Sequence, residues 1–259
     1  MLRDLILRAQ RKRLLVRPRV IVCVPSGITE VEKRAVRDSA LHAGAREVYL
    51  VSEPVAAAIG ADLPIEEAFG NMVMDIGGGT SEIAVISLSH IVVHNSIRVG
   101  GDKMDNDIIS YLRKKNNLHV GLQTAEKIKM TIGSAYPLKE ELTMDVRGRD
   151  IVSGFPVTIK ISSEEVREAL SETIATMVDA IKRLFERTAP ELSADIAERG
   201  IFLTGGGAML KGLDEKISKT VDLPVYVVPD ALECVVKGAG KVLDELDRYR
   251  DVLIKRIED

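Results

Sequence analysis

Short apolar runs and amphipathic segments alternate along the first part of the chain. Residues 20–24 and 48–51 are β-branched and aliphatic, which is typical of strands buried on both faces. Between them, Thr29 and Glu32 have the spacing of a capping box, which predicts a helix. The small apolar segment after the second run predicts a closely packed helix that Gly60 ends as a C-cap. The pattern is that of a βαβα unit.

The middle of the chain predicts a second group of strands and an inserted lobe. Residues 72–75 and 82–86 are apolar strands joined by a loop with three glycines, too many for a two-residue hairpin turn. A third strand is expected at 91–98. An α+β lobe follows, with a hairpin whose turn is expected to contain Gly148 and Gly154. Its expected elements are helices at 102–115 and 124–133 and strands at 142–147 and 157–161.

A long amphipathic helix is predicted next. Ser162 and Glu165 form a second capping box, and apolar residues then recur at three- and four-residue steps. These residues are Val166, Leu170, Ile174, Met177, Ile181 and Leu184. Strands at 200–204 and 225–228 and a closing helix complete the chain. The alternation of strands and helices predicts an α/β fold.

Composition and charge exclude several classes of protein. The 259 residues carry 36 Lys and Arg against 39 Asp and Glu, and the net charge of −3 does not favour a nucleic-acid-binding protein. No apolar run reaches the roughly 18 residues of a membrane span. Cys23 and Cys234 have neither the spacing of a metal site nor that of a disulfide framework, so a reducing cytoplasm is the expected setting.

Three glycine-rich loops follow strands, at 77–79, 100–101 and 205–207. Glycine lets backbone N–H groups approach phosphate oxygens that a Cβ would exclude. One such loop alone would more simply be a turn. The first loop, however, follows Asp75, a carboxylate able to hold magnesium through water, and precedes Thr80, whose hydroxyl can bind a phosphate. Since neither G-x-x-x-x-G-K-[ST] nor G-x-G-x-x-G occurs, the loops predict a nucleotide cleft of another type.

Several of these strings resemble a known superfamily. Residues 73–80 (VMDIGGGT) resemble the second phosphate loop of the actin, sugar kinase and heat-shock chaperone superfamily, and residues 203–208 (LTGGGA) resemble its adenosine motif. Over about residues 17–254 the chain is similar to the MreB family of bacterial actin homologues. The segments that carry this likeness are 17–20, 25–34, 43–49, 53–60 and 133–138. The resemblance implies an α/β, actin-like ATPase (ribonuclease H-like) fold.

The resemblance also implies a division into subdomains. MreB-like chains begin with an Asp-x-Gly phosphate hairpin and a small lobe called IB, whereas this sequence begins with the segment that follows them. We therefore expect an N-terminally truncated form of the fold with an inserted α+β lobe. The implied parts are a remnant of subdomain IA at 1–62 and 237–259, subdomain IIA at 63–103 and 167–236, and subdomain IIB at 104–166.

The roles of individual residues follow from the resemblance alone. Asp75 would lie near Mg²⁺ and hold it through water, and Glu53 would position the water that attacks ATP. The residues expected at the phosphates are Gly77, Gly78, Gly79 and Thr80. Those expected at the ribose and adenine are Glu126, Lys127, Ile128, Lys129, Gly205, Gly206, Gly207 and Ala208, with Lys127 standing where the family usually has a second Glu. Because the first phosphate hairpin is missing, the expected activity is weak ATP binding and at most slow hydrolysis.

The N-terminal segment is strongly basic. Residues 1–19 hold seven Lys and Arg and one Asp, a local charge of 7 − 1 = +6. Leu14, Leu15 and Val16 lie inside this cationic stretch, an arrangement that fits insertion into an anionic membrane surface and equally a solvated basic face. MreB-like proteins bind the membrane through an apolar loop here, so the resemblance implies a cytoplasmic protein, peripheral at the inner face of the cell membrane.

The leading hypothesis for function is an MreB-like cytoskeletal protein that forms membrane-associated filaments and determines rod shape. The alternative is a non-catalytic paralogue that binds or regulates full-length filaments. The expected partners are further copies or full-length MreB-type subunits, the membrane surface and cell-shape membrane proteins, with no nucleic acid. A small-molecule kinase of the same superfamily is poorly supported, since no substrate lobe beyond the inserted one is predicted.

Overall fold

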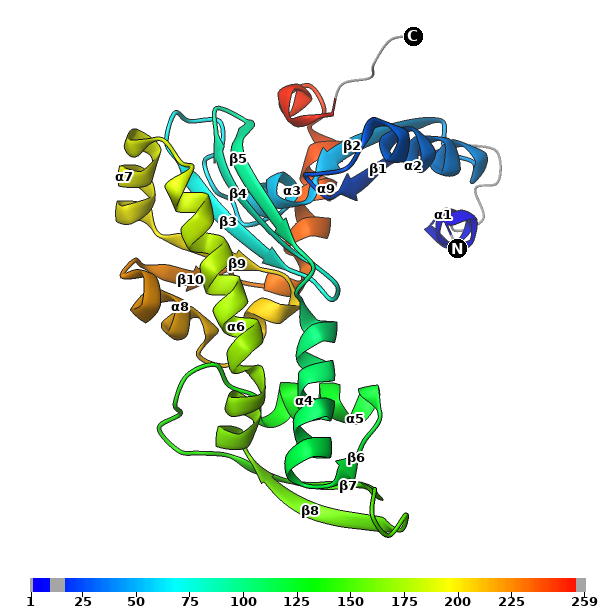
Figure 1. Ribbon diagram of the computed structural model, residues 1–259. Helices are drawn as coiled ribbons and strands as arrows, with labels where there is room; N and C mark the ends of the chain where they lie inside the picture. The colour runs from blue at the N-terminus through cyan, green and yellow to red at the C-terminus, as the bar shows by residue number, and fades with distance from the viewer. Residues whose placement is uncertain (1, 10–16, 255–259) are drawn as a thin grey trace.

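The structure, a computed structural model, describes residues 2–9 and 17–254 and is built around a five-stranded sheet. The strand order is β10-β9-β3-β4-β5, with β3 antiparallel to β4 and parallel to β9 (Figure 1). Every residue of β3 and β4 is buried, as their continuous apolar sequences predict. The strands are β3 (Asn71–Ile76), β4 (Ser81–Ser87), β5 (His90–Ile97), β9 (Ile201–Thr204) and β10 (Val225–Val227).

The sheet separates two hydrophobic cores. Met72 and Met74 of β3 belong to the core beneath α6, whereas Val73 belongs to the core beneath α3 and α9. Successive side chains of a strand point to opposite faces, so one strand serves both cores. Of the helices on the α6 side, α6 itself begins with the Ser162–Glu165 capping box that the sequence predicts, and the six apolar positions predicted for it are all buried. These helices are α6 (Ser163–Glu186), α7 (Pro190–Arg199) and α8 (Leu213–Val221).

A smaller βαβα unit lies beside the sheet (Figure 1). Its two parallel strands carry helices on both sides, and the Thr29–Glu32 capping box opens the first helix as predicted. The C-terminal helix α9 packs against α3, although the two helices lie far apart in the sequence. The elements are β1 (Arg19–Val24), α2 (Glu30–His42), β2 (Glu47–Ser52), α3 (Glu53–Gly60) and α9 (Cys234–Asp244), and the short helix α1 (Leu2–Ala9) packs on α2.

Gly60 has a different role from the predicted C-cap. It is the last residue of α3, and Ala61 is the C-cap. A Cβ on Gly60 would lie 1.9 Å from the carbonyl oxygen of Cys234, so the glycine is needed where α3 touches α9. The close packing predicted for this helix is confirmed, and its partner is the end of the chain.

The inserted lobe has the predicted hairpin and two helices, and the short strand β6, which was not predicted, adds a third strand to its sheet (Figure 1). The expected place of Gly148 in the hairpin turn is wrong, because Gly148 lies within β7. A Cβ there would lie 2.7 Å from the carbonyl oxygen of His119, so the glycine lets β6 approach. Gly154 is in the turn, with φ +78°. The elements are α4 (Gly101–Lys115), β6 (Leu118–His119), α5 (Leu122–Ile132), β7 (Thr143–Asp150) and β8 (Pro156–Ser162).

Candidate functional site

Two of the predicted loops leave the sheet from neighbouring parallel strands. Asp75 of β3 is paired with Thr204 of β9, and both strands end within one residue of a glycine-rich loop. The Thr204 hydroxyl donates a 3.0 Å hydrogen bond to Oδ1 of the buried Asp75. Because the carboxyl ends of parallel strands meet at one sheet edge, the pairing brings the two glycine loops together there.

The loop after β9 fits tightly against the end of β3. Gly205 has φ +81°, and a Cβ on it would lie 2.4 Å from the carbonyl oxygen of Ile76 and 2.6 Å from Oδ1 of Asp75. A Cβ on Gly207 would lie 2.2 Å from Cγ2 of Ile76. Both glycines are therefore required by close approach, and the short 3-10 helix that follows (Gly206–Met209) starts directly at this edge.

The start of α4 holds the loop of residues 77–79 in place through backbone hydrogen bonds. The N–H of Gly101 donates to the carbonyl of Gly77 at 3.0 Å, and the N–H of Asp102 donates to the carbonyl of Gly78 at 2.8 Å. A Cβ on Gly100 would lie 2.6 Å from both carbonyl oxygens. Gly78 and Gly79 remain exposed, with open space where a Cβ on Gly79 would be. The result is a glycine turn fixed by the first N–H groups of α4, with the exposed backbone of Gly78 and Gly79 open to a ligand.

Three carboxylates lie around this edge. Glu53 is the first residue of α3, and Glu82 of β4 lies directly opposite Asp75 of β3. Burial, followed by the charges of Asp75 and Glu82, raises the pKa of Glu53 to about 7. Burial also raises the pKa of Asp75, opposed by the Thr204 hydrogen bond and assisted by the charge of Glu82. Mutual repulsion of this kind would be relieved by a bound cation.

The donor set fits a cation held through water. Within the residues that the structure describes, no group of three His, Cys, Asp or Glu is close enough to hold a metal ion directly. Carboxylate oxygens are the ligands that Mg²⁺ prefers, and this ion usually keeps several of its waters. The interpretation of Asp75 as a water-mediated magnesium residue is therefore compatible with the site.

The four predicted residues of α5 differ in their surroundings. Glu126 and Lys127 are exposed, whereas Ile128 is fully buried in the core. Lys129 forms an ion pair with Asp105 at 2.9 Å, and its ammonium group also donates to the carbonyl of Gly101 at 3.0 Å. Lys129 thus supports the start of α4, beneath the first glycine loop, while the exposed pair is free to meet a ligand.

Sequence reasoning missed three polar residues next to this edge. Glu82 is only 1% exposed, although it is charged. One of its oxygens accepts the N–H of Ser26 at 3.2 Å, and Ser26 and Ser52 are joined through their hydroxyl oxygens at 2.9 Å. The sequence signal for Glu82 is a single acid at the start of an apolar run, but only the strand register shows that it lies opposite Asp75.

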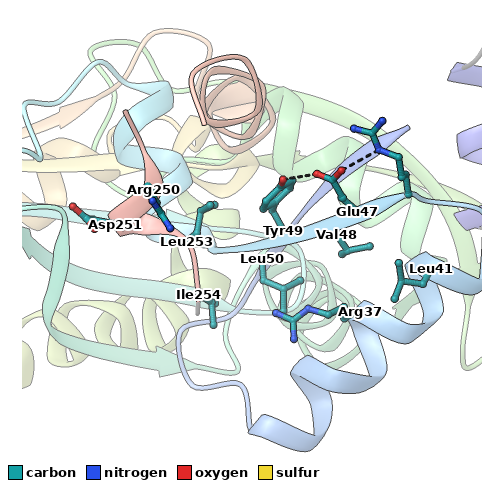
Figure 2. Close-up of a pocket in the computed structure, with 11 residues that line it drawn as sticks. Arg37, Leu41, Glu47, Val48, Tyr49, Leu50, Arg250, Asp251, Leu253 and Ile254 are labelled. Carbon is teal, nitrogen blue, oxygen red and sulfur yellow. Dashed lines mark hydrogen bonds and ion pairs between the residues drawn. The ribbon is translucent and has the colours of Figure 1, made fainter. Parts of the chain in front are cut away.

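A cavity lies elsewhere, at the outer edge of β2. It has a volume of about 670 Å³ and is bounded by α2, β2 and residues 250–254 (Figure 2). Figure 2 shows Tyr49 and Glu47 on its wall, where the Tyr49 hydroxyl donates to Glu47 at 2.7 Å and lowers the pKa of that carboxyl. None of the predicted site residues lines it.

The predicted membrane residues Leu14, Leu15 and Val16 lie outside the described residues. Across residues 2–9 and 17–254, none of the helices has the length and apolar character needed to cross a membrane.

Comparison with known proteins gives a consistent result. A family model described as MreB/Mbl protein matches residues 1–251. Cell shape-determining protein MreB of Escherichia coli K12 is 51% identical over 232 residues, which are 90% of this chain and 67% of that protein. Cell shape-determining protein Mbl of Bacillus subtilis 168 is 45% identical over 248 residues, 96% of this chain and 74% of that protein.

A solved structure agrees with these relatives. The crystal structure of MreB5 of Spiroplasma citri bound to ADP has a TM-score of 0.91 and 38% sequence identity, covering 96% of this chain and 76% of that one. The predicted actin-like α/β fold is confirmed by this likeness.

Proposed function

Since the chain belongs to the MreB/Mbl family of actin-like, cell shape-determining proteins, we propose that it is an ATP-binding subunit of a cytoskeletal filament. The observation that carries the proposal is the meeting of three glycine loops at one sheet edge beside the carboxylates of Glu53 and Asp75. The relative MreB5 of Spiroplasma citri, bound to ADP, supports a nucleotide as the ligand.

The parts of the site have separate roles in this proposal. The loop Gly77, Gly78, Gly79 and Thr80 binds the β- and γ-phosphates, since its glycines admit a close approach. Asp75 holds Mg²⁺ through water, and the ion when bound would neutralise charge on the phosphates. The exposed Glu126 and Lys127 of α5 contact the ribose and adenine, and residues 205–208 close over the base.

Glu53 is the group that positions the attacking water. Its carboxyl lies at the start of α3, and a pKa near 7 suits a group that accepts a proton at neutral pH. Phosphoryl transfer depends mainly on positioning and electrostatics, and positioning of the water is the contribution proposed for Glu53. Calorimetric titration with ATP, with and without Mg²⁺, tests binding, and Glu53→Ala tests turnover. Failure of the folded protein to bind ATP would refute the proposal.

The family's subdomains map onto the elements. In this proposal β1, α2, β2, α3 and α9 form the part of subdomain IA that is present, within residues 1–62 and 237–259. The five-stranded sheet with α6, α7 and α8 forms IIA, within 63–103 and 167–236, and the three-stranded lobe forms IIB, within 104–166. One core lies between the IA elements and the sheet, whereas the other is shared by IIA and IIB.

Filament assembly is the expected role of the fold. Head-to-tail contacts require two complementary faces, so polymers form when the same surfaces repeat. Ultracentrifugation of the chain with ATP, alone and mixed with a full-length MreB-type protein, is the test. Sedimentation alone supports a filament subunit, whereas sedimentation only in the mixture would favour the alternative of a regulator, which none of the comparisons favours.

The membrane surface is the proposed location, at the cytoplasmic face, together with cell-shape membrane proteins. The local charge of +6 in residues 1–19 and the apolar Leu14, Leu15 and Val16 support it. Flotation with anionic liposomes tests this part. Unchanged flotation of the Leu14→Ser/Leu15→Ser double variant would contradict insertion by these side chains.

A further inference from the structure

Two serines from different segments are in contact, and one of them, Ser52, directly precedes Glu53 in the sequence. Ser26 lies in the loop after β1, and Ser52 is the last residue of β2. These strands are parallel, with Val24 opposite Ser52, so both serines emerge at the same edge. Their hydroxyl oxygens are 2.9 Å apart. The hydroxyl of Ser52 is thus engaged in a hydrogen bond with Ser26. Ser52 directly precedes Glu53, the residue proposed to position the attacking water.

Ser52 is also the N-cap of α3, but its side chain makes no capping hydrogen bond to that helix. A serine at this position ordinarily bonds the N–H of the second or third helical residue, which stabilises a helix by roughly 1 kcal/mol. Here the hydroxyl turns to Ser26 instead. Since the second helical residue is Pro54, which has no N–H, only the N–H of Val55 could be capped, and the hydroxyl makes a contact between segments instead.

Ser26 also contacts Glu82, which belongs to the five-stranded sheet. The N–H of Ser26 donates to Oε2 of Glu82 at 3.2 Å, while the Ser96 hydroxyl donates to Oε1. Glu82 is the second residue of β4, directly after the glycine loop, and is 1% exposed. Its carboxylate is therefore fixed from two sides and lies within three residues of Gly79.

We propose that Ser26, Ser52 and Glu82 form a hydrogen-bonded link that sets the position of Glu53 relative to the phosphate loop. The link runs from β4, at the end of the loop, through Ser26 to Ser52, which is bonded covalently to Glu53. It acts as a positioning device and touches no substrate. It rests on the proposed role of Glu53 in ATP hydrolysis.

The test compares turnover with nucleotide affinity in five variants of the full chain. Ser26→Ala and Ser52→Ala each lower kcat roughly tenfold, since small misplacements cost about this much or more, while the ADP dissociation constant changes less than about twofold. The Ser26→Ala/Ser52→Ala double variant is no slower than either single variant, because one contact is lost in all three. Ser26→Thr, which keeps the hydroxyl, retains turnover. Ser39→Ala, at an exposed position of α2, is the matched control.

The outcomes separate this link from the proposed function. Wild-type protein without ATP turnover, or turnover that Glu53→Ala leaves unchanged, overturns the role of Glu53 and the link with it. Turnover that is lost in Glu53→Ala but unchanged in both serine variants overturns the link alone. A serine variant that does not fold is replaced by Glu82→Gln, and if this variant loses ADP affinity in step with kcat, the link is only structural and the proposal fails.

Discussion

Gly60 and Gly238 lie face to face where α3 and α9 cross. A Cβ on Gly238 would lie 1.8 Å from the carbonyl oxygen of Ala56 and 2.9 Å from the backbone nitrogen of Gly60. Since the atoms in the way belong to the backbone, a side chain cannot be accommodated by a change of rotamer. The crossing fixes the position of α3, the helix whose first residue is Glu53.

Replacing Gly238 with alanine is expected to destabilise the protein strongly. The two helices must move apart, and overpacking of this kind costs about 3 kcal/mol or more. Gly240→Ala, two residues further along α9, is the matched control, since nothing lies within 4 Å of a Cβ there. Helix propensity predicts that the control gains up to about 1 kcal/mol. Urea unfolding of both variants measures the difference, and equal stabilities would contradict the close crossing.

Gly79→Ala is expected to separate folding from nucleotide binding. A Cβ on Gly79 meets nothing within 4 Å in the protein, so the midpoint of thermal unfolding should be unchanged. The methyl group would occupy the space that a phosphate needs, so ADP affinity should fall roughly tenfold or more. Calorimetry measures it. Full ADP affinity in this variant would remove residue 79 from the phosphate site.

Gly205→Ala is expected to damage both properties. The backbone has φ +81°, and the added Cβ would meet the carbonyl oxygen of Ile76 at 2.4 Å and Asp75 at 2.6 Å. We expect a loss of about 2 kcal/mol or more in the free energy of unfolding, together with weaker ADP binding. Comparison with Gly79→Ala in the same assays is the check, and a Gly205→Ala protein as stable as wild type would show that this edge can relax.

Glu53 should make the ligand-free protein less stable as the pH rises. Its pKa in the folded state, about 7, exceeds the ordinary value of 4.5, so the folded state binds the proton more tightly than the unfolded state. The stabilisation is complete below about pH 4.5 and is lost as the pH rises through 7. Allowing for the partial exposure of Glu53, Glu53→Gln should exceed wild type by about 1–2 kcal/mol at pH 8.

The measurement is urea unfolding in EDTA at pH 5 and pH 8. Glu172→Gln, at an exposed position of α6, is the control. An advantage of Glu53→Gln that is the same at both pH values would contradict the raised pKa.

Lys129 is expected to contribute through its ion pair. Asp105 is 6% exposed, so Lys129→Met leaves a buried carboxylate without its partner at a cost of about 3 kcal/mol. Adding Asp105→Asn should recover part of that loss, because the buried charge is removed. A double-mutant cycle in urea measures the coupling, and additive effects would show that the pair is weak.

Much of the fold could be predicted from the sequence because its signals are local. The capping boxes at Thr29 and Ser162 and the apolar strands at 72–75 and 82–86 are patterns of adjacent residues, and the structure confirms them. The run at 20–24 forms a strand, but its expected burial on both faces is wrong, because only Val24 is buried. The glycines were harder to interpret. Gly60 and Gly148 look like turn residues in sequence, but each is required by a backbone that approaches from a distant segment.

The site could be predicted only in part. The loop of residues 77–80 and Asp75 are contiguous, so they stand out in the sequence. Glu82 and Ser26 belong to different segments, 56 residues apart, and only the tertiary fold brings them together. The roles of the site residues, from Glu53 to Ala208, stay predictions until nucleotide binding is measured.

The packing of α9 against α3 also determines at what point during synthesis the first part of the chain can become stable. Lys241 donates to the carbonyl oxygen of Ile59 across 182 positions of sequence, and the core beneath α3 includes Val242. A ribosome must therefore make the chain as far as Val242 before that core can close. Until then the early apolar strands stay uncovered, which makes the nascent protein a natural client for chaperones and its refolding slow.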